Sequence, residues 1–144
     1  MVRRIFVAGA LALGVTAALA QANVIEQRQN LMKQNNSHAR TVAGMLRGQA
    51  PFNLAQAQAA LQNYVVVGQQ FPTLFPDNSK TGGDTRALPA IWENKTDFTA
   101  HSTKLAQDAQ AALTTVRDEA TFKTEFPKVL QNCDACHDKY RRRT

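Results

Sequence analysis

The two cysteines of the chain stand near its C-terminus, in the run Cys133-Asp134-Ala135-Cys136-His137. A Cys-x-x-Cys-His run is the signature of covalent c-type haem attachment. Two thiols three positions apart on a helix can both reach the vinyl edge of one porphyrin, and the histidine that follows can place its imidazole under the iron. The run therefore predicts one haem c, bound through Cys133 and Cys136, with His137 as an iron ligand.

A Cys-x-x-Cys pair also occurs in thioredoxin-like redox sites and in zinc sites, and each of these needs further elements. A redox pair normally lies beside a βαβ pattern, and a structural zinc site has four Cys or His ligands at close spacing. The sequence has no second cysteine pair, and its other two histidines, His38 and His101, lie far upstream among polar residues. We therefore favour haem attachment, and we expect both upstream histidines to be exposed rather than bound to iron.

Residues 1–20 have the pattern of a secretory signal peptide. Arg3 and Arg4 form a positive start, residues 5–19 are apolar, and Ala18-Leu19-Ala20 is a small-x-small cleavage site, with cleavage after Ala22 as the alternative. The apolar segment is short and alanine-rich for a spanning helix, so an uncleaved anchor is the less favoured interpretation. Export agrees with the haem motif, because c-type haem is attached outside the cytoplasmic membrane. The sequence thus predicts a periplasmic protein without stable membrane insertion after cleavage.

Cleavage after Ala20 would leave residues 21–144, enough for one domain with one hydrophobic core. Loss of Arg3 and Arg4 lowers the formal charge from +6 to +4. Part of this positive excess lies at the chain end, at Lys139 and residues 141–143, where cations also suit the negative end of a helix dipole. This end is either a solvated helix terminus or a docking patch for an acidic redox partner. No nucleic-acid-binding motif accompanies it.

The mature chain is predicted to be all-α, because its apolar residues follow helical spacing and no strand pattern of any length occurs. The expected elements are helices at 24–47, at 53–69 with Asn53 as N-cap, from 88–91 to about 116 and from about 122 through the haem motif, with an irregular crossover at 71–89. Pro127 is expected near the first turn of the last helix. Four such segments describe an antiparallel four-helix bundle with the haem attached near the C-terminus.

Four short motifs resemble the class II c-type cytochromes, the cytochrome c prime family. They are Arg28-Gln29-x-Leu31-Met32, Gly48-x-Ala50-Pro51, Gly82-Gly83-Asp84-x-Arg86 before Ile91-Trp92, and the C-terminal Cys-x-x-Cys-His-Asp-x-Tyr-Arg. The resemblance covers essentially the whole mature chain, and it is specific because class I cytochromes c carry the haem motif near the N-terminus. It implies a periplasmic haem protein built as a four-helix bundle, often as a homodimer.

The resemblance leaves the sixth position on the iron open. Cytochromes c prime are five-coordinate and high-spin and bind nitric oxide and carbon monoxide, whereas their low-spin relatives use a methionine thioether from the first helix and carry electrons. Met32 stands at this position, and the runs 31–33, 48–52 and 71–77 resemble the low-spin members more. We expect Met32 to bind the iron; the alternative is a core methionine packed beside the ring. Met45 lies too far along the helix to serve.

The resemblance also implies a set of residues around the haem. Arg28 and Gln29 match a pair that lies against the haem edge in relatives, and the guanidinium of Arg28 suits a propionate carboxylate. Asp84 matches a residue near the haem rim. Arg141, four residues beyond His137, is expected on the same helical face, close to the proximal side of the ring. For both arginines, an exposed surface position is the alternative.

The function expected from the sequence is electron carriage by a haem whose iron is saturated by His137 and Met32. The alternative is a five-coordinate protein that binds a small gas on an open distal face. Peroxidase activity is not expected, because no distal acid–base histidine is evident beside Met32. We therefore expect a carrier or gas-binding protein rather than an enzyme.

Overall fold

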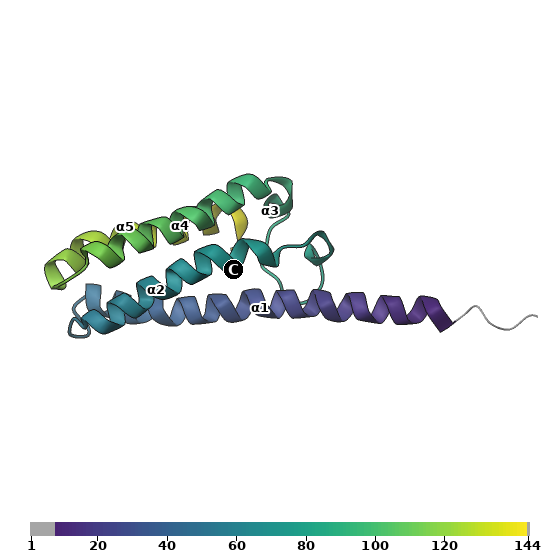
Figure 1. The fold of residues 1–144 in the computed structure, drawn as a ribbon, viewed down its shortest axis with the longest axis horizontal. Coiled ribbons are helices and arrows are strands. Elements are labelled where there is room, and N and C mark those ends of the chain that lie inside the picture. Colours follow the sequence, from purple (N-terminus) through teal and green to yellow (C-terminus); the bar gives the residue numbers. More distant parts are fainter. Residues whose placement is uncertain (1–7, 144) are drawn as a thin grey trace, which may run out of the picture.

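A computed structural model of the protein describes residues 8–143, with side chains described for Gln21 and from Asn23 onward. Four long helices form the antiparallel bundle that the sequence predicts, and Figure 1 shows α1 lying along α2, with α4 and α5 as a second pair. The elements are α1 (Ala8–Leu46), α2 (Leu54–Gln70), two 3-10 helices (Phe71–Leu74 and Asp77–Ser79), α3 (Ala90–Glu93), α4 (Lys95–Thr115) and α5 (Glu119–Tyr140). The all-α prediction is confirmed.

The first helix is longer than predicted. It begins at Ala8 rather than near Val24, runs through both predicted cleavage positions, and extends beyond the rest of the bundle in Figure 1. Alanine and leucine dominate residues 8–20, and they are strong helix formers. The signal peptide stays a prediction, and its residues 1–7 lie outside the described part of the chain. Within residues 8–143, no helix is both long enough and apolar enough to cross a membrane.

The helix ends follow the signals in the sequence. Gly48 takes the left-handed conformation that ends α1, with φ of 69°, and its N–H donates to the Met45 carbonyl. Asn53 caps α2, since its side chain accepts from the Gln56 N–H at 2.9 Å. Asp118 and Thr121 form a capping box at the start of α5, so this helix begins a few residues earlier than predicted.

Two details of the predicted helices are wrong. The third helix is two helices, because Asn94 leaves the helical conformation and caps α4 by accepting from the Asp97 N–H at 3.2 Å. Pro127 lies in the interior of α5 rather than near its first turn. The helix continues past it because Pro127 is on the exposed face, where water can hydrate the carbonyl that loses its partner.

The apolar interior has two parts. The larger part, which we call the closed-end core, lies toward the short connections after α1 and before α5; there the rings of Phe52 and Phe122 approach to 5.1 Å. Its buried members are Val42, Met45, Ala57, Ala60, Leu61, Tyr64, Ala109, Ala112, Val116, Phe122, Phe126 and Val129. The smaller part, the crossover core, lies under residues 71–92. Its buried members are Phe75, Ile91, Phe98 and Tyr140.

The inner helices α2 and α4 pack against each other most extensively. A Cβ at Gly68 would lie 2.6 Å from the Ser102 carbonyl oxygen and 2.8 Å from the Ala106 Cβ, so only glycine fits this contact. By contrast, the outer helices α1 and α5 touch each other little. Between α1 and α5, therefore, the interior of the bundle is closed least by direct contact between helices.

Candidate haem site

The last turns of α5 carry the haem motif on a half-buried face. Cys133, Cys136 and His137 are half-buried, and they lie between the buried residues Asn132 and Tyr140. Both cysteines are free thiols. Burial raises the pKa of the Cys133 thiol and raises that of Cys136 to about 11, so both are protonated at neutral pH. Their spacing on one helix lets both sulfurs reach the same side of a planar group.

His137 is held in its neutral form. Burial lowers the pKa of its imidazole, and the positive charge of Arg141 lowers it further, while Asp134 and Asp138 oppose the shift weakly. A neutral imidazole keeps a nitrogen lone pair free, which a metal ligand requires. The α5 end thus combines two free thiols with a histidine that can bind iron.

Met32 lies on the inner face of α1. Residues 28, 32 and 35 share one helical face, and Arg28 and Asn35 are buried whereas Met32 between them is only half-buried. Asn35 is tied to α2, because its side-chain oxygen accepts from the Asn63 amide at 3.0 Å. Met32 is thus less buried than its neighbours on the inner face of α1. The same holds on α5, where the three residues of the haem motif are half-buried: Cys133, Cys136 and His137.

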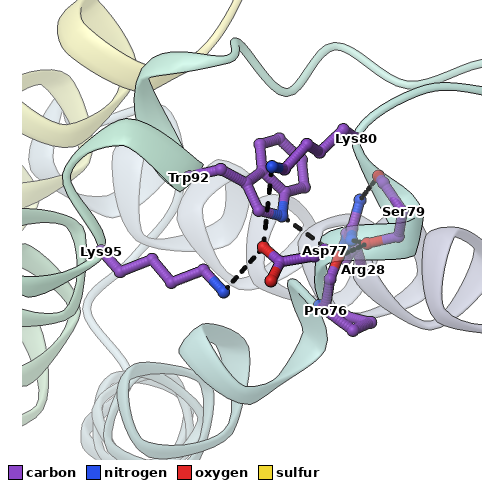
Figure 2. A network of polar contacts seen from close by, with 7 residues as sticks. All are labelled: Arg28, Pro76, Asp77, Ser79, Lys80, Trp92 and Lys95. Atoms are coloured by element: carbon purple, nitrogen blue, oxygen red, sulfur yellow. Dashed lines mark hydrogen bonds and ion pairs between the residues drawn. The ribbon is translucent and has the colours of Figure 1, made fainter.

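The buried guanidinium of Arg28 holds the crossover (Figure 2). Its Nε donates to the Leu74 carbonyl at 2.5 Å, its Nη1 donates to the Ser79 carbonyl at 3.3 Å, and its Nη2 donates to the Ser79 hydroxyl. The guanidinium also stacks 4.0 Å from the Phe75 ring centre and 5.5 Å from that of Trp92. The crossover thus packs around the side chain of Arg28. The family resemblance predicts this side chain at the haem edge.

Arg28 keeps its charge without a carboxylate partner among the described residues. Burial lowers the pKa of its guanidinium to about 10, so it is still protonated at neutral pH. A buried cation that has only neutral acceptors can take an anionic group, such as a propionate, as a further partner.

The crossover connects α1 to the end of α5. Gln29 Nε2 donates to the Asp84 carbonyl at 2.6 Å, and the Leu88 N–H donates to the Tyr140 carbonyl at 3.0 Å. Trp92 Nε1 donates to the Pro76 carbonyl at 3.1 Å, as Figure 2 shows. Residues 71–89 therefore span the strip between the outer helices at the level of the haem motif. Asp84 contributes its backbone here, and its side chain is exposed.

Arg141 is not on the helical face predicted for it. The helix ends at Tyr140, and Arg141 is extended, with φ of −119° and ψ of 128°, pairing with Ala87 in a single antiparallel bridge. The reason is that the chain turns into this bridge instead of continuing the helix. Arg141 is exposed, and its positive charge lowers the pKa of the His137 imidazole, after the effect of burial.

Asp97 is a positioning residue that the sequence analysis did not find. Its carboxylate accepts from Lys139 Nζ at 2.6 Å and from the Tyr140 hydroxyl, and His101 Nε2 lies 3.5 Å away. These bonds lower the pKa of Asp97 and tie the end of α5 to the start of α4. No local pattern could have indicated contacts between residues about forty positions apart. His101 is half-buried against Tyr140 rather than exposed, and His38 is also half-buried.

Tyr64, on α2, carries a polar atom in an apolar environment. It is fully buried, and its hydroxyl has no hydrogen-bond partner among the described residues. Burial raises its pKa, and so does the nearby Cys133 sulfur. This orphaned hydroxyl, the half-buried thiols, the neutral imidazole of His137 and the thioether of Met32 are groups that suit a covalently attached porphyrin.

Comparison with known proteins agrees with this site. A family model described as Cytochrome C' matches residues 23–141. The chain is 44% identical over 135 residues to cytochrome c' of Rhodopseudomonas palustris, covering 94% of this chain and 92% of that one. It is 36% identical over 125 residues to cytochrome c-556 of Agrobacterium fabrum, covering 86% of this chain and 84% of that one.

Solved structures give the same result. The crystallised cytochrome c' from Rhodopseudomonas palustris superposes with a TM-score of 0.82 at 44% identity, covering 84% of this chain and 97% of that one. An NMR-validated structural model of oxidised cytochrome c556 from the same organism shares the fold, with a TM-score of 0.77 at 23% identity over 85% of this chain and 98% of that one. The chain therefore belongs to the cytochrome c' family of class II c-type cytochromes, and it carries haem c attached covalently through Cys133 and Cys136.

Proposed function

We propose that the protein is a periplasmic electron carrier whose haem iron is bound by His137 and Met32. The observation that carries this proposal is the position of Met32, half-buried on the inner face of α1 between the buried residues Arg28 and Asn35. His137 lies on the half-buried face of α5 that carries the haem motif. A thioether and an imidazole would together hold one haem iron.

The bound haem supplies a one-electron ferric/ferrous couple. The neutral imidazole of His137 would give one ligand without first losing a proton. The Met32 thioether would raise the potential, because a soft sulfur ligand favours ferrous iron. Arg28 would act in the same direction, since a buried positive charge near the ring favours the state with one more electron. The protein would then carry electrons rather than catalyse a reaction.

Exposed cations at the end of α5 support docking to an acidic redox protein. Lys139 is paired with Asp97, and Arg143 with Asp138 at 2.9 Å, so these charges are partly neutralised. Arg141 and Arg142 are exposed and follow the haem motif directly. Electrostatic attraction would bring an acidic partner to the edge of the bundle next to the haem.

The second candidate is a five-coordinate protein that binds a small gas such as nitric oxide or carbon monoxide. It is favoured by the 44% identity to a protein named cytochrome c', whereas proteins named cytochrome c-556 or c-555 match at 28–36% identity. In this case Met32 would pack over the distal face without binding the iron, and gas would enter beside it. The same family resemblance motivates the proposal of a homodimer, which sedimentation can test.

Replacement of Met32 by alanine separates the two candidates. If Met32 binds the iron, Met32→Ala converts low-spin spectra to high-spin, lowers the reduction potential and opens the iron to carbon monoxide. The matched control is Met45→Ala, which removes a methionine from the closed-end core, where its sulfur accepts from the Asn53 N–H at 3.3 Å. This control should lower stability and leave the spectrum unchanged. A Met32→Ala spectrum identical to wild type would reject ligation.

A further inference from the structure

The Tyr64 hydroxyl is an unusual feature of an otherwise apolar core. Tyr64 is 0% exposed, and its neighbours in the closed-end core are aliphatic or phenylalanine side chains. A buried hydroxyl without a partner destabilises a protein, whereas phenylalanine at this position would fill almost the same volume without that cost. The hydroxyl therefore needs an acceptor that the described side chains do not supply.

The surroundings of Tyr64 indicate where that acceptor lies. Its ring meets the Phe126 ring edge-on at 6.1 Å, and Phe126 is two helical turns before Cys133 on the same face of α5. The charge of the Cys133 sulfur, after burial, also raises the pKa of Tyr64. The ring contact with Phe126 thus places Tyr64 in the part of the closed-end core that leads along α5 to the haem motif.

The polar side chains next to this part of the core are engaged elsewhere. The Asn63 amide donates to Asn35, and the Asn132 amide donates to Asp108 at 2.8 Å and to the Val129 carbonyl at 3.1 Å. Neither asparagine bonds the Tyr64 hydroxyl. As a free thiol, Cys133 does not bond the hydroxyl either, and its sulfur becomes a thioether when the haem is attached.

We propose that the Tyr64 hydroxyl donates a hydrogen bond to the Cys133 thioether sulfur of the attached haem, directly or through one bound water. Tyr64 is then a positioning and tuning residue. The bond holds the Cys133 edge of the ring against α2, and it draws electron density from the porphyrin periphery, which favours ferrous haem. The role is the same whether or not Met32 binds the iron, so it is independent of the electron-carrier proposal.

The test is Tyr64→Phe in the haem-loaded protein, which removes one oxygen and keeps the ring. The expected result is a lower guanidinium midpoint together with a lower reduction potential. The wild-type protein should also show a slowly exchanging hydroxyl proton resonance that is shifted by the haem iron and missing from the variant. The resonance is observed in wild type, so it tests the bond even if the variant folds poorly.

The control is Phe126→Leu, which changes the ring packed against Tyr64 and leaves the hydroxyl in place. It should lower the midpoint while the potential and the hydroxyl resonance stay as in wild type. A midpoint that rises or does not change in Tyr64→Phe would mean that the hydroxyl is still unpaired in the loaded protein, which overturns the proposal. A lower midpoint with an unchanged potential and no shifted resonance would place its acceptor away from the haem, and would overturn it as well.

Discussion

The two ends of the bundle are built in opposite ways from the same helices. At the closed end, the inner positions of α1, α2, α4 and α5 hold mostly aliphatic and phenylalanine side chains, with Met45 and Tyr64, that are almost fully buried by one another. At the haem end, Met32 on α1 and the two thiols and the imidazole on α5 are all half-buried. The protein thus fills its own interior at the closed end and leaves the groups of the haem motif only partly covered.

The segments that connect the helices also differ between the two ends of the bundle. Short turns around Gly48 and Val116 join the helices at the closed end, where capping hydrogen bonds and the packing of the closed-end core fix their positions. The crossover at the haem end is long and is held by polar contacts from Arg28, Gln29 and Trp92. Polar contacts can hold a segment in place without filling the interior beneath it with apolar side chains.

Loss of both thiols should have the largest effect on the haem end. In the double variant Cys133→Ser and Cys136→Ser no thioether can form, so denatured protein should release all of its haem into acid–acetone. Wild type should retain its haem, and its mass should exceed that of the polypeptide by one haem. Haem that stays with the denatured double variant would show that attachment does not depend on these cysteines.

Truncation in the closed-end core should destabilise the fold without altering the haem. Phe122 is fully buried and stacks on Phe52 and Phe126, so Phe122→Ala should lower the free energy of unfolding by about 3–5 kcal/mol. Val66→Ala is the control, because Val66 is 44% exposed and should change stability by about 0.5 kcal/mol or less. A changed haem spectrum in folded Phe122→Ala would show that the two ends are not independent.

The basic end of α5 should affect electron transfer several-fold. In Arg141→Gln with Arg142→Gln, the rate of reaction with an acidic redox protein should fall at low ionic strength, and its dependence on salt should weaken. Arg40→Gln removes an exposed arginine from α1, distant in sequence from this end, and should have little effect. If wild type reacts at a rate that does not depend on salt, the exposed arginines are a solvated terminus rather than a docking surface.

The Asp97 contacts should give a smaller, pH-dependent effect. Bonds from Lys139 and Tyr140 lower the Asp97 pKa in the folded state, so its contribution is present above the unfolded pKa and is lost as pH falls through the folded pKa. The unfolding midpoints of wild type and Asp97→Asn should differ at pH 7 and converge below about pH 4. Asp84→Asn is the control, because its exposed side chain should not change the midpoint. A wild-type advantage that persists at pH 2 would contradict this assignment.

The sequence was sufficient for the features that depend on local patterns. The haem motif, the cap at Asn53, the stop at Gly48 and the four-helix arrangement all follow from spacing and residue type. The break at Asn94 was not predicted, because an asparagine can either continue a helix or cap a new one. The place of Pro127 was predicted wrongly, because a proline is tolerated inside a helix when it lies on the exposed face.

The contacts around the site could not be derived in the same way. Arg28 meets Ser79, and Tyr140 meets Asp97, across more than forty residues, so the pairs exist only once the crossover and the helices are in place. The orphaned hydroxyl of Tyr64 was hidden for a different reason. Tyrosine on an apolar face fits the core pattern, and only the three-dimensional surroundings show that its oxygen lacks a partner.

The most direct test of the electron-carrier proposal is the optical spectrum of the wild-type protein in both oxidation states, recorded with and without carbon monoxide. Iron bound by His137 and Met32 predicts low-spin haem in both states, a weak near-infrared sulfur-to-iron band in the ferric protein, and little reaction of the ferrous protein with carbon monoxide. A ferrous protein that is high-spin and binds carbon monoxide readily would contradict ligation by Met32, and the gas-binding function would take its place.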